Sequence, residues 1–180
     1  MKKRLFALLF CLISCFAVCF TACKNEPEKT TYTVTFRQDG HADIVKELNI
    51  GETLADIPVP VAQDGYQIVW DRVDFGGLSD DIVVTAVYTP NEYRVYFHLN
   101  RDDALLPQGA NVTYDETKYM YYTAIKYNAE VQVFTPTSQY ASFVKWENVE
   151  TGEVYGGGKY LLTEDLYVRA VWDVTHTPYA

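Results

Sequence analysis

Apolar and polar residues alternate in short runs along most of the chain. Tyr32, Val34 and Phe36 are separated by the polar residues Thr33 and Thr35. A period of two gives a β-strand one apolar and one polar face, so this run predicts a strand that is buried on one side. Similar runs predict further strands at 44–50, 65–70, 81–88, 93–97, 117–127, 142–146 and 165–172.

Residues 51–57 show a different spacing. Leu54 and Ile57 are three residues apart, which suits one or two helical turns, and Pro58 and Pro60 would end them. With this short helix, the predicted fold class is α+β, mostly β.

The chain also contains an internal repeat. Residues 81–88 (DIVVTAVY) align without gaps on residues 165–172 (DLYVRAVW), and each segment closes a unit that contains a strand ending in tryptophan. Repeated order of this kind predicts tandem structural units. We assign residues 32–89 to a first repeat, residues 91–173 to a second repeat, and residues 174–180 to a C-terminal tail.

The N-terminus has the organisation of a bacterial export signal. Three basic residues at 2–4 precede an apolar run at 5–22. Residues 20–23 (FTAC) resemble a lipobox, which predicts a signal peptide at 1–22 and acylation of Cys23. Residues 23–31 would then be the lipidated cysteine and a flexible tether.

Two other interpretations of the N-terminus stay open. Residues 12–15 (LISC) also fit a lipobox, and cutting there would make Cys15 the lipidated residue. Residues 5–22 are also about as long as a short membrane-spanning helix. All three interpretations predict an extracytoplasmic protein anchored to a bacterial membrane, with the cell surface as its expected location.

Charge limits the partners of the mature chain. The signal removes three of the 15 basic residues and none of the 24 acidic ones, which leaves a formal net charge of −12. Such a surface repels phosphate backbones and anionic headgroups, so neither nucleic acid nor a charge-bound membrane is an expected partner. The membrane contact would be the lipid. Because all four cysteines lie within residues 1–23, the rest of the chain has no disulfide available.

Known catalytic and metal-binding patterns are missing from the sequence. His41, His98 and His176 are too far apart in sequence for a zinc motif. Residues 156–159 (GGGK) lack the first glycine and the Ser or Thr of a phosphate-binding loop and predict a hairpin turn instead. We therefore expect no catalytic residue, no cofactor and no metal. A surface enzyme or inhibitor is the least favoured class.

Tyrosine is the more informative residue type, with 15 copies. The predicted strand 117–127 carries the candidate ligand-binding residues Tyr119, Tyr121, Tyr122 and Tyr127. Adjacent residues point to opposite faces of a strand, so at least one of the adjacent pair at 121–122 should be exposed or lie between repeats. Stacking on a sugar or a protein partner and packing between repeats both stay open.

The first repeat resembles the internalin B-repeat family, also called the Listeria/Bacteroides repeat. The motif positions are Tyr32, Val34, Phe36, Gly51, Leu54, Pro58, Gly65, Tyr66, Ile68, Trp70, Asp81, Ile82, Val84, Ala86 and Tyr88. In the second repeat the resemblance covers the opening strand and the part from Trp146 to Trp172. Trp70, Trp146 and Trp172 stand at core positions of the family, so the resemblance predicts that they are packing anchors. It implies small β-grasp-like units that recur in tandem on bacterial surface proteins and serve adhesion or spacing rather than catalysis.

These observations predict a lipid-anchored cell-surface binding or spacer module, which would act in adhesion or protein interaction. The alternative is a glycan-binding surface lipoprotein of a polysaccharide uptake system. The ligand, protein or glycan, is not specified by the sequence.

Overall fold

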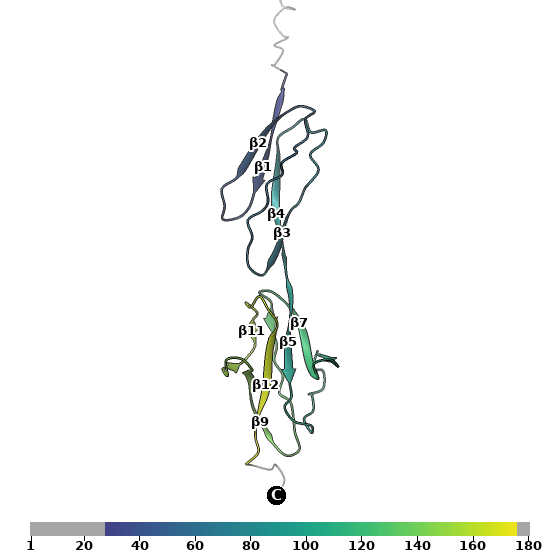
Figure 1. Ribbon diagram of the computed structural model, residues 1–180, viewed down its shortest axis with the longest axis vertical. Coiled ribbons are helices and arrows are strands. Elements are labelled where there is room, and N and C mark those ends of the chain that lie inside the picture. Colours follow the sequence, from purple (N-terminus) through teal and green to yellow (C-terminus); the bar gives the residue numbers. More distant parts are fainter. Residues whose placement is uncertain (1–27, 176–180) are drawn as a thin grey trace, which may run out of the picture.

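The computed structural model describes residues 28–175, which form two β-sheet modules arranged end to end (Figure 1). This part of the chain contains twelve strands and no helix. The prediction of a mostly β, tandem-repeat protein is confirmed, but its helical component is wrong, and the fold class is all-β. No helix capable of crossing a membrane occurs between residues 28 and 175. The predicted signal peptide and Cys23 lie outside the described residues.

The first module is a four-stranded sheet with the order β2-β1-β4-β3. Its strands are β1 (Thr31–Arg37), β2 (Ile44–Asn49), β3 (Tyr66–Trp70) and β4 (Ile82–Pro90). β1 and β4 are parallel neighbours at the centre, while the edge strands pair with them in the antiparallel sense. The alternating side chains of β1 that the sequence assigned to the core are buried.

The expected helical turns at 51–57 are absent. Gly51 has φ 88°, and from residue 53 to residue 63 the chain follows an irregular path with no helical or strand assignment. Leu54 and Ile57 still pack on the core of the module. A helix of seven residues forms too few hydrogen bonds to compensate for the free-energy cost of nucleation. Pro58 also disfavours the helical conformation at the residue before it. The three-residue spacing of Leu54 and Ile57 therefore predicted correctly that both side chains face the core. The helical conformation predicted for the segment is wrong.

The second module contains a six-stranded sheet with the order β10-β9-β12-β5-β7-β6 and a small two-stranded sheet of β11 and β8. Its strands are β5 (Glu92–His98), β6 (Thr113–Asp115), β7 (Met120–Lys126), β8 (Glu130–Val131), β9 (Ser142–Asn148), β10 (Val154–Tyr155), β11 (Gly158–Lys159) and β12 (Leu166–Asp173).

Two local predictions in this module are wrong. The strand expected from residue 117 begins only at Met120, because residues 116–119 form the turn between β6 and β7. Residues 156–159 do not form the predicted hairpin turn, because β10 pairs with β9 and β11 pairs with β8. A Cβ at Gly157 would lie 2.5 Å from the Val131 carbonyl oxygen, so this glycine permits the close approach of the two segments.

The two modules repeat the same central pairing. In each, the first strand lies parallel to the last strand with matched neighbours. The pairs are Val34–Ile82 and Phe36–Val84 in the first module, and Val95–Leu166 and Phe97–Val168 in the second. The alignment of residues 81–88 with 165–172 therefore corresponds to a shared sheet register.

Tryptophan organises both cores in the same way. The indole Nε1 of Trp70 donates to the carbonyl oxygen of Pro58 at 2.6 Å, and that of Trp146 donates to the carbonyl oxygen of Phe134 at 2.7 Å. In both cases the acceptor lies 12 residues before the tryptophan. Each indole bond therefore fixes a non-strand segment over the core of its module. Trp172, which is half-buried, donates to the Leu99 carbonyl oxygen at 2.8 Å.

A single residue, Asn91, separates the last strand of the first module from the first strand of the second. Its N–H donates to the carbonyl oxygen of Gly65 at 2.8 Å, and its carbonyl oxygen accepts from the Tyr127 N–H at 2.9 Å. The Tyr127 ring covers Gly65 and meets the Tyr66 ring edge-on, with centroids 5.3 Å apart. The link is therefore held by the first module through Gly65 and by the second through Tyr127.

Replacing Trp146 with phenylalanine should destabilise the second module. Trp146→Phe leaves the Phe134 carbonyl without its donor, and we expect the free energy of unfolding to fall by about 1–3 kcal/mol for an unpaired buried polar group. Urea denaturation followed by circular dichroism measures this change. Tyr140→Phe, at a residue that is 54% exposed, is the control and should have no effect. Equal stability of the wild type and Trp146→Phe would contradict the assigned role of the indole.

Candidate functional site

The four candidate tyrosines lie at three separate places. Tyr119 is in the turn before β7 and is 75% exposed. Tyr121 and Tyr122 point to opposite faces of β7, as adjacent strand residues should: Tyr121 packs on the core, and Tyr122 pairs with Tyr96 on the outer face. Tyr127 lies at the junction between the modules, where it fills the packing role that the sequence left open.

Tyr122 belongs to a closed cluster on the outer face of the second sheet, formed with Arg94, Tyr96, Lys118 and Tyr167. The rings of Tyr96 and Tyr167 stack with centroids 4.9 Å apart and planes 5° apart. The Lys118 ammonium lies 4.4 Å from the Tyr96 ring centroid, and the Arg94 guanidinium lies 4.6 Å from that of Tyr122. These are cation–π contacts.

The cations of this outer-face cluster are already engaged. Lys118 Nζ also donates to the Tyr167 hydroxyl, and this hydrogen bond raises the pKa of Lys118 above its usual value. Arg94 donates to the Tyr96 hydroxyl at 3.2 Å. Tyr96 is 1% exposed, so the cluster covers its own central ring. We therefore assign this face to packing rather than to ligand binding.

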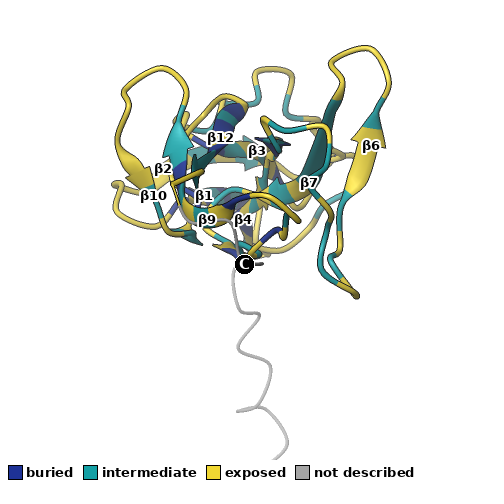
Figure 2. Ribbon diagram, turned by 90° about the horizontal axis from the view of Figure 1, so that it is seen from below, coloured by how far each residue is buried: buried dark blue, intermediate teal, exposed yellow. Residues whose placement is uncertain are grey.

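An open pocket lies at the end of the second module that is farthest from the first module. β5 runs away from the junction and β7 returns toward it, so the loop after β5 and the turn before β7 meet at this end. We call this hollow the tip pocket; it encloses about 650 Å³. Its lining residues are His98, Leu99, Asn100, Arg101, Asp102, Ala104, Tyr114, Tyr119 and Tyr121. Figure 2, seen from this end, shows β6, the edge strand of the sheet, as mostly exposed.

Three tyrosines give the tip pocket aromatic walls. Tyr114 on β6 pairs with Tyr121 on β7, and their ring centroids are 5.0 Å apart at an interplanar angle of 56°. Tyr114 is 46% exposed, less than Tyr119. The pocket therefore combines one ring anchored in the core with two rings that reach solvent.

Two lining residues have a positive backbone φ angle, which is unfavourable for one of them. Asn100 has φ 58° and Tyr119 has φ 56°, in the left-handed region. Asparagine tolerates this region, but a bulky residue such as tyrosine seldom adopts it. The chain around the pocket therefore holds an exposed aromatic ring at an energetic cost, which is typical of functional sites.

Hydrogen bonds hold the loop that carries Asn100 and Arg101 in place. Arg101 Nε donates to Asp103 at 2.8 Å, and the Ser138 hydroxyl donates to the same carboxylate at 2.6 Å. The Ser138 hydrogen bond, followed by that of Arg101, lowers the pKa of Asp103 from 3.8 to about 2. Backbone hydrogen bonds between Leu105 and Thr137, at 2.8 and 3.0 Å, fix the same loop.

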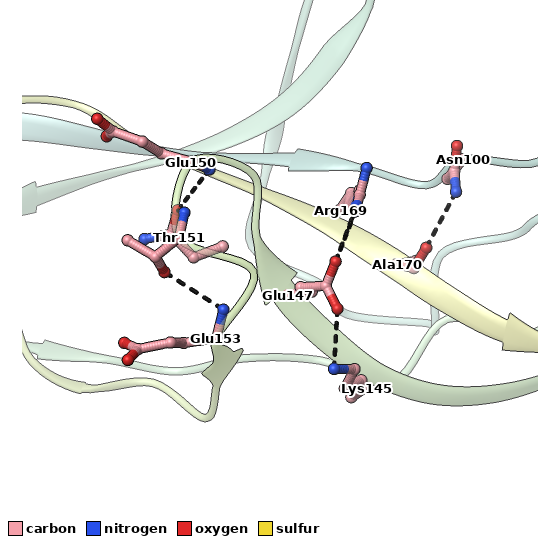
Figure 3. Close-up of polar contacts among 9 residues, drawn as sticks. Asn100, Lys145, Glu147, Glu150, Thr151, Glu153, Arg169 and Ala170 are labelled. Atoms are coloured by element: carbon pink, nitrogen blue, oxygen red, sulfur yellow. Dashed lines mark hydrogen bonds and ion pairs between the residues drawn. The ribbon is translucent and has the colours of Figure 1, made fainter.

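A second hollow of about 400 Å³ shares Asn100 and Arg101 with the tip pocket. Its carboxylate is already paired, as Figure 3 shows: Glu147 lies between Lys145, at 2.8 Å, and Arg169, at 2.7 Å. These partners, Lys145 first, lower the pKa of the Glu147 carboxyl. Because its charged groups satisfy one another, this hollow is the weaker candidate.

No group of three or more potential metal ligands occurs in the described part of the chain. His41 lies in the first module and His98 at the tip pocket of the second, while His176 is outside the described residues. The pocket residues suit hydrogen bonding and stacking.

Sequence reasoning missed most of the tip pocket. Tyr114 lies in a strand of only three residues, too short for alternation to detect, and the Asn100–Arg101 pair lies in a polar loop. The signal that could have identified the pocket is the pairing of Tyr114 on β6 with Tyr121 on β7. That pairing can be predicted only if the turn at 116–119 is recognised first.

Neither a protein-family model nor a curated protein matches the chain. Among solved structures, the chain is similar to Streptococcal High Identity Repeats in Tandem (SHIRT) domains 3–4 from a cell surface protein. That match has 17% sequence identity, covers 81% of this chain and 98% of the other, and has a TM-score of 0.28.

The hydrogen bonds of the Asp103 carboxylate that hold the pocket loop should depend on pH. Because the folded-state pKa of Asp103 is lowered, its carboxylate stabilises the loop above about pH 4, and this contribution is lost as the pH falls through about 2. Ser138→Ala removes the largest cause, so the pKa of Asp103 should rise toward 3.8. An NMR titration of the Asp103 carboxyl carbon measures it. Ser79→Ala, whose hydroxyl donates to Asp80, is the matched control and should leave it unchanged.

Proposed function

We propose that the protein is a lipid-anchored extracytoplasmic spacer that holds a binding tip away from a bacterial membrane. The described chain starts at the outer end of the first module and finishes at the tip of the second (Figure 1). An anchor at Cys23, eight residues before β1, would place the tip at the end far from the membrane. Such a module serves adhesion or protein interaction and needs no catalytic residue.

The observation that carries this proposal is the bonding of the linker residue. A spacer keeps its two ends at a fixed distance only if its modules do not rotate freely relative to each other. A linker without hydrogen bonds would allow that rotation. Asn91 has both of its backbone polar groups bonded, one to each module. The close packing of Tyr127 on Gly65 adds a contact that a larger residue would prevent.

The N-terminal sequence and the composition of the modules support the surface location. A basic start, an apolar run and the FTAC junction are the features of a lipoprotein signal. A chain without cysteine after residue 23 needs no oxidising enzyme to fold once exported. The resemblance of its motifs to internalin B-repeats favours the same role.

A substitution at Gly65 should loosen the junction. A Cβ there would lie 2.3 Å from Tyr127 Cγ, so Gly65→Ala must displace the ring. Residues 24–180 contain no cysteine, which allows spin labels at Val59→Cys and Val144→Cys, both at exposed positions in different modules. Pulsed electron paramagnetic resonance should give one narrow distance distribution for the parent chain and a broader one with Gly65→Ala.

Gly77→Ala is the matched control for this experiment. Gly77 also has positive φ, 69°, but a Cβ there meets nothing within 4 Å. It therefore introduces the same kind of backbone strain without touching the junction, and its distance distribution should stay narrow. A broad distribution in the parent chain would show that the modules move independently and would overturn the spacer proposal.

The anchor has its own test. Intact-mass measurement of the mature protein should show a chain that begins at Cys23 and carries fatty acyl groups. Cys23→Ser should abolish that mass, whereas Cys15→Ser, at the competing lipobox, should leave it unchanged. A mature chain that starts at Lys24, keeps Met1, or is acylated at Cys15 would contradict the assignment.

A further inference from the structure

We propose that the tip pocket binds a neutral oligosaccharide, with Tyr119 and Tyr114 as stacking platforms and Asn100, Arg101 and Asp102 as hydroxyl partners. The proposal deepens the binding role of the spacer, and it rests on the proposed function only for the outward orientation of the tip.

The aromatic walls provide the first argument. A sugar ring has an apolar C–H face, which can lie against an aromatic ring, and a periphery of hydroxyls. Tyr119 presents its ring to solvent from a strained backbone position, and Tyr114 presents a second ring from β6. Neither ring is needed to fill the core, because Tyr121 provides the core contact at this end. The rings of Tyr114 and Tyr119 are therefore accessible to a ligand.

The polar side of the pocket provides the second argument. Each sugar hydroxyl both donates and accepts a hydrogen bond, so adjacent hydroxyls need donors and acceptors side by side. Asn100, whose Nδ2 already donates to the Ala170 carbonyl oxygen at 3.3 Å, offers its amide oxygen as an acceptor. Arg101 and Asp102, the next two residues, offer guanidinium donors and carboxylate acceptors. Arg101 is oriented by Asp103, which fixes the direction of its remaining donors. The loop is thus prepared before a ligand arrives.

Size and charge narrow the ligand class. A pocket of about 650 Å³ is within the usual range for small-molecule sites. The charge of Arg101 is balanced by Asp103, and Asp102 adds an acidic group at the rim. Because the mature chain also carries a large negative charge, anionic polysaccharides are repelled, while neutral ones are not.

The experiment uses the full chain, purified from membranes in detergent, on an array of neutral and anionic oligosaccharides. Neutral members should be retained. Calorimetry with the best neutral oligosaccharide should then show a loss of affinity of about tenfold or more for Tyr119→Ala, the scale of one aromatic contact. Tyr119→Phe keeps the ring and should bind like the wild type. Tyr140→Ala removes a comparably exposed tyrosine outside the pocket and should have no effect.

Tyr114→Ala is the second variant and should also weaken binding, and thermal unfolding of each variant confirms that the fold is intact. Retention of anionic members only, silence of the whole array, or undiminished binding by both Tyr119→Ala and Tyr114→Ala would overturn the proposal. None of these results bears on the distance distribution between the modules, so failure of the ligand assignment and failure of the spacer are distinguishable.

Discussion

The parallel pairing of the first strand with the last strand of each module is the interaction on which the whole structure depends. It places β1 beside β4 and β5 beside β12 at the centre of their sheets, and the other strands of these two sheets extend outward from the central pairs. An aspartate closes the start of each ladder: the Asp81 carboxylate accepts from the Thr33 N–H at 2.7 Å, and the Asp165 carboxylate accepts from the Arg94 N–H at 2.8 Å. Because β4 ends where β5 begins, the last strand of one module leads directly into the first strand of the next. The end-to-end shape follows from that continuity (Figure 1).

Strand direction then decides which loops can meet a partner. β5 leaves the junction and ends at His98, so the loop that follows is carried to the tip, and β7 starts there. The opposite ends of these strands lie at the junction, where Tyr127 is used for packing. A tyrosine-rich segment thus serves packing at one end and exposure at the other. Each module has its own apolar core, so the junction needs only a small set of contacts to hold them in line.

The two aromatic groupings of the second module show why exposure, and not composition, identifies a site. The outer-face cluster contains stacked tyrosines and two cations, a composition that often indicates binding, but its members satisfy one another and cover Tyr96. At the tip pocket the rings of Tyr114 and Tyr119 remain accessible, and the loop beneath is held by Asp103. The difference arises from the turn at 116–119, which carries Lys118 over one face and Tyr119 to the other side of the strand end.

The sequence by itself determined the longer strands and the repeat, because alternation and the matched segments at 81–88 and 165–172 are local patterns that a sheet must obey. The strands of two or three residues, such as β6, are too short to show alternation. The sequence failed at 51–57, where a spacing of three fits both a helical turn and an irregular segment held over the core. The hydrogen bonds from Tyr32 to Glu52 and from Trp70 to Pro58 hold the irregular segment in place. The sequence also could not choose among the tyrosines. Which ring is buried, stacked or exposed depends on the register between β5 and β7 and on the path of a short turn, and these are set by contacts between residues far apart in the chain.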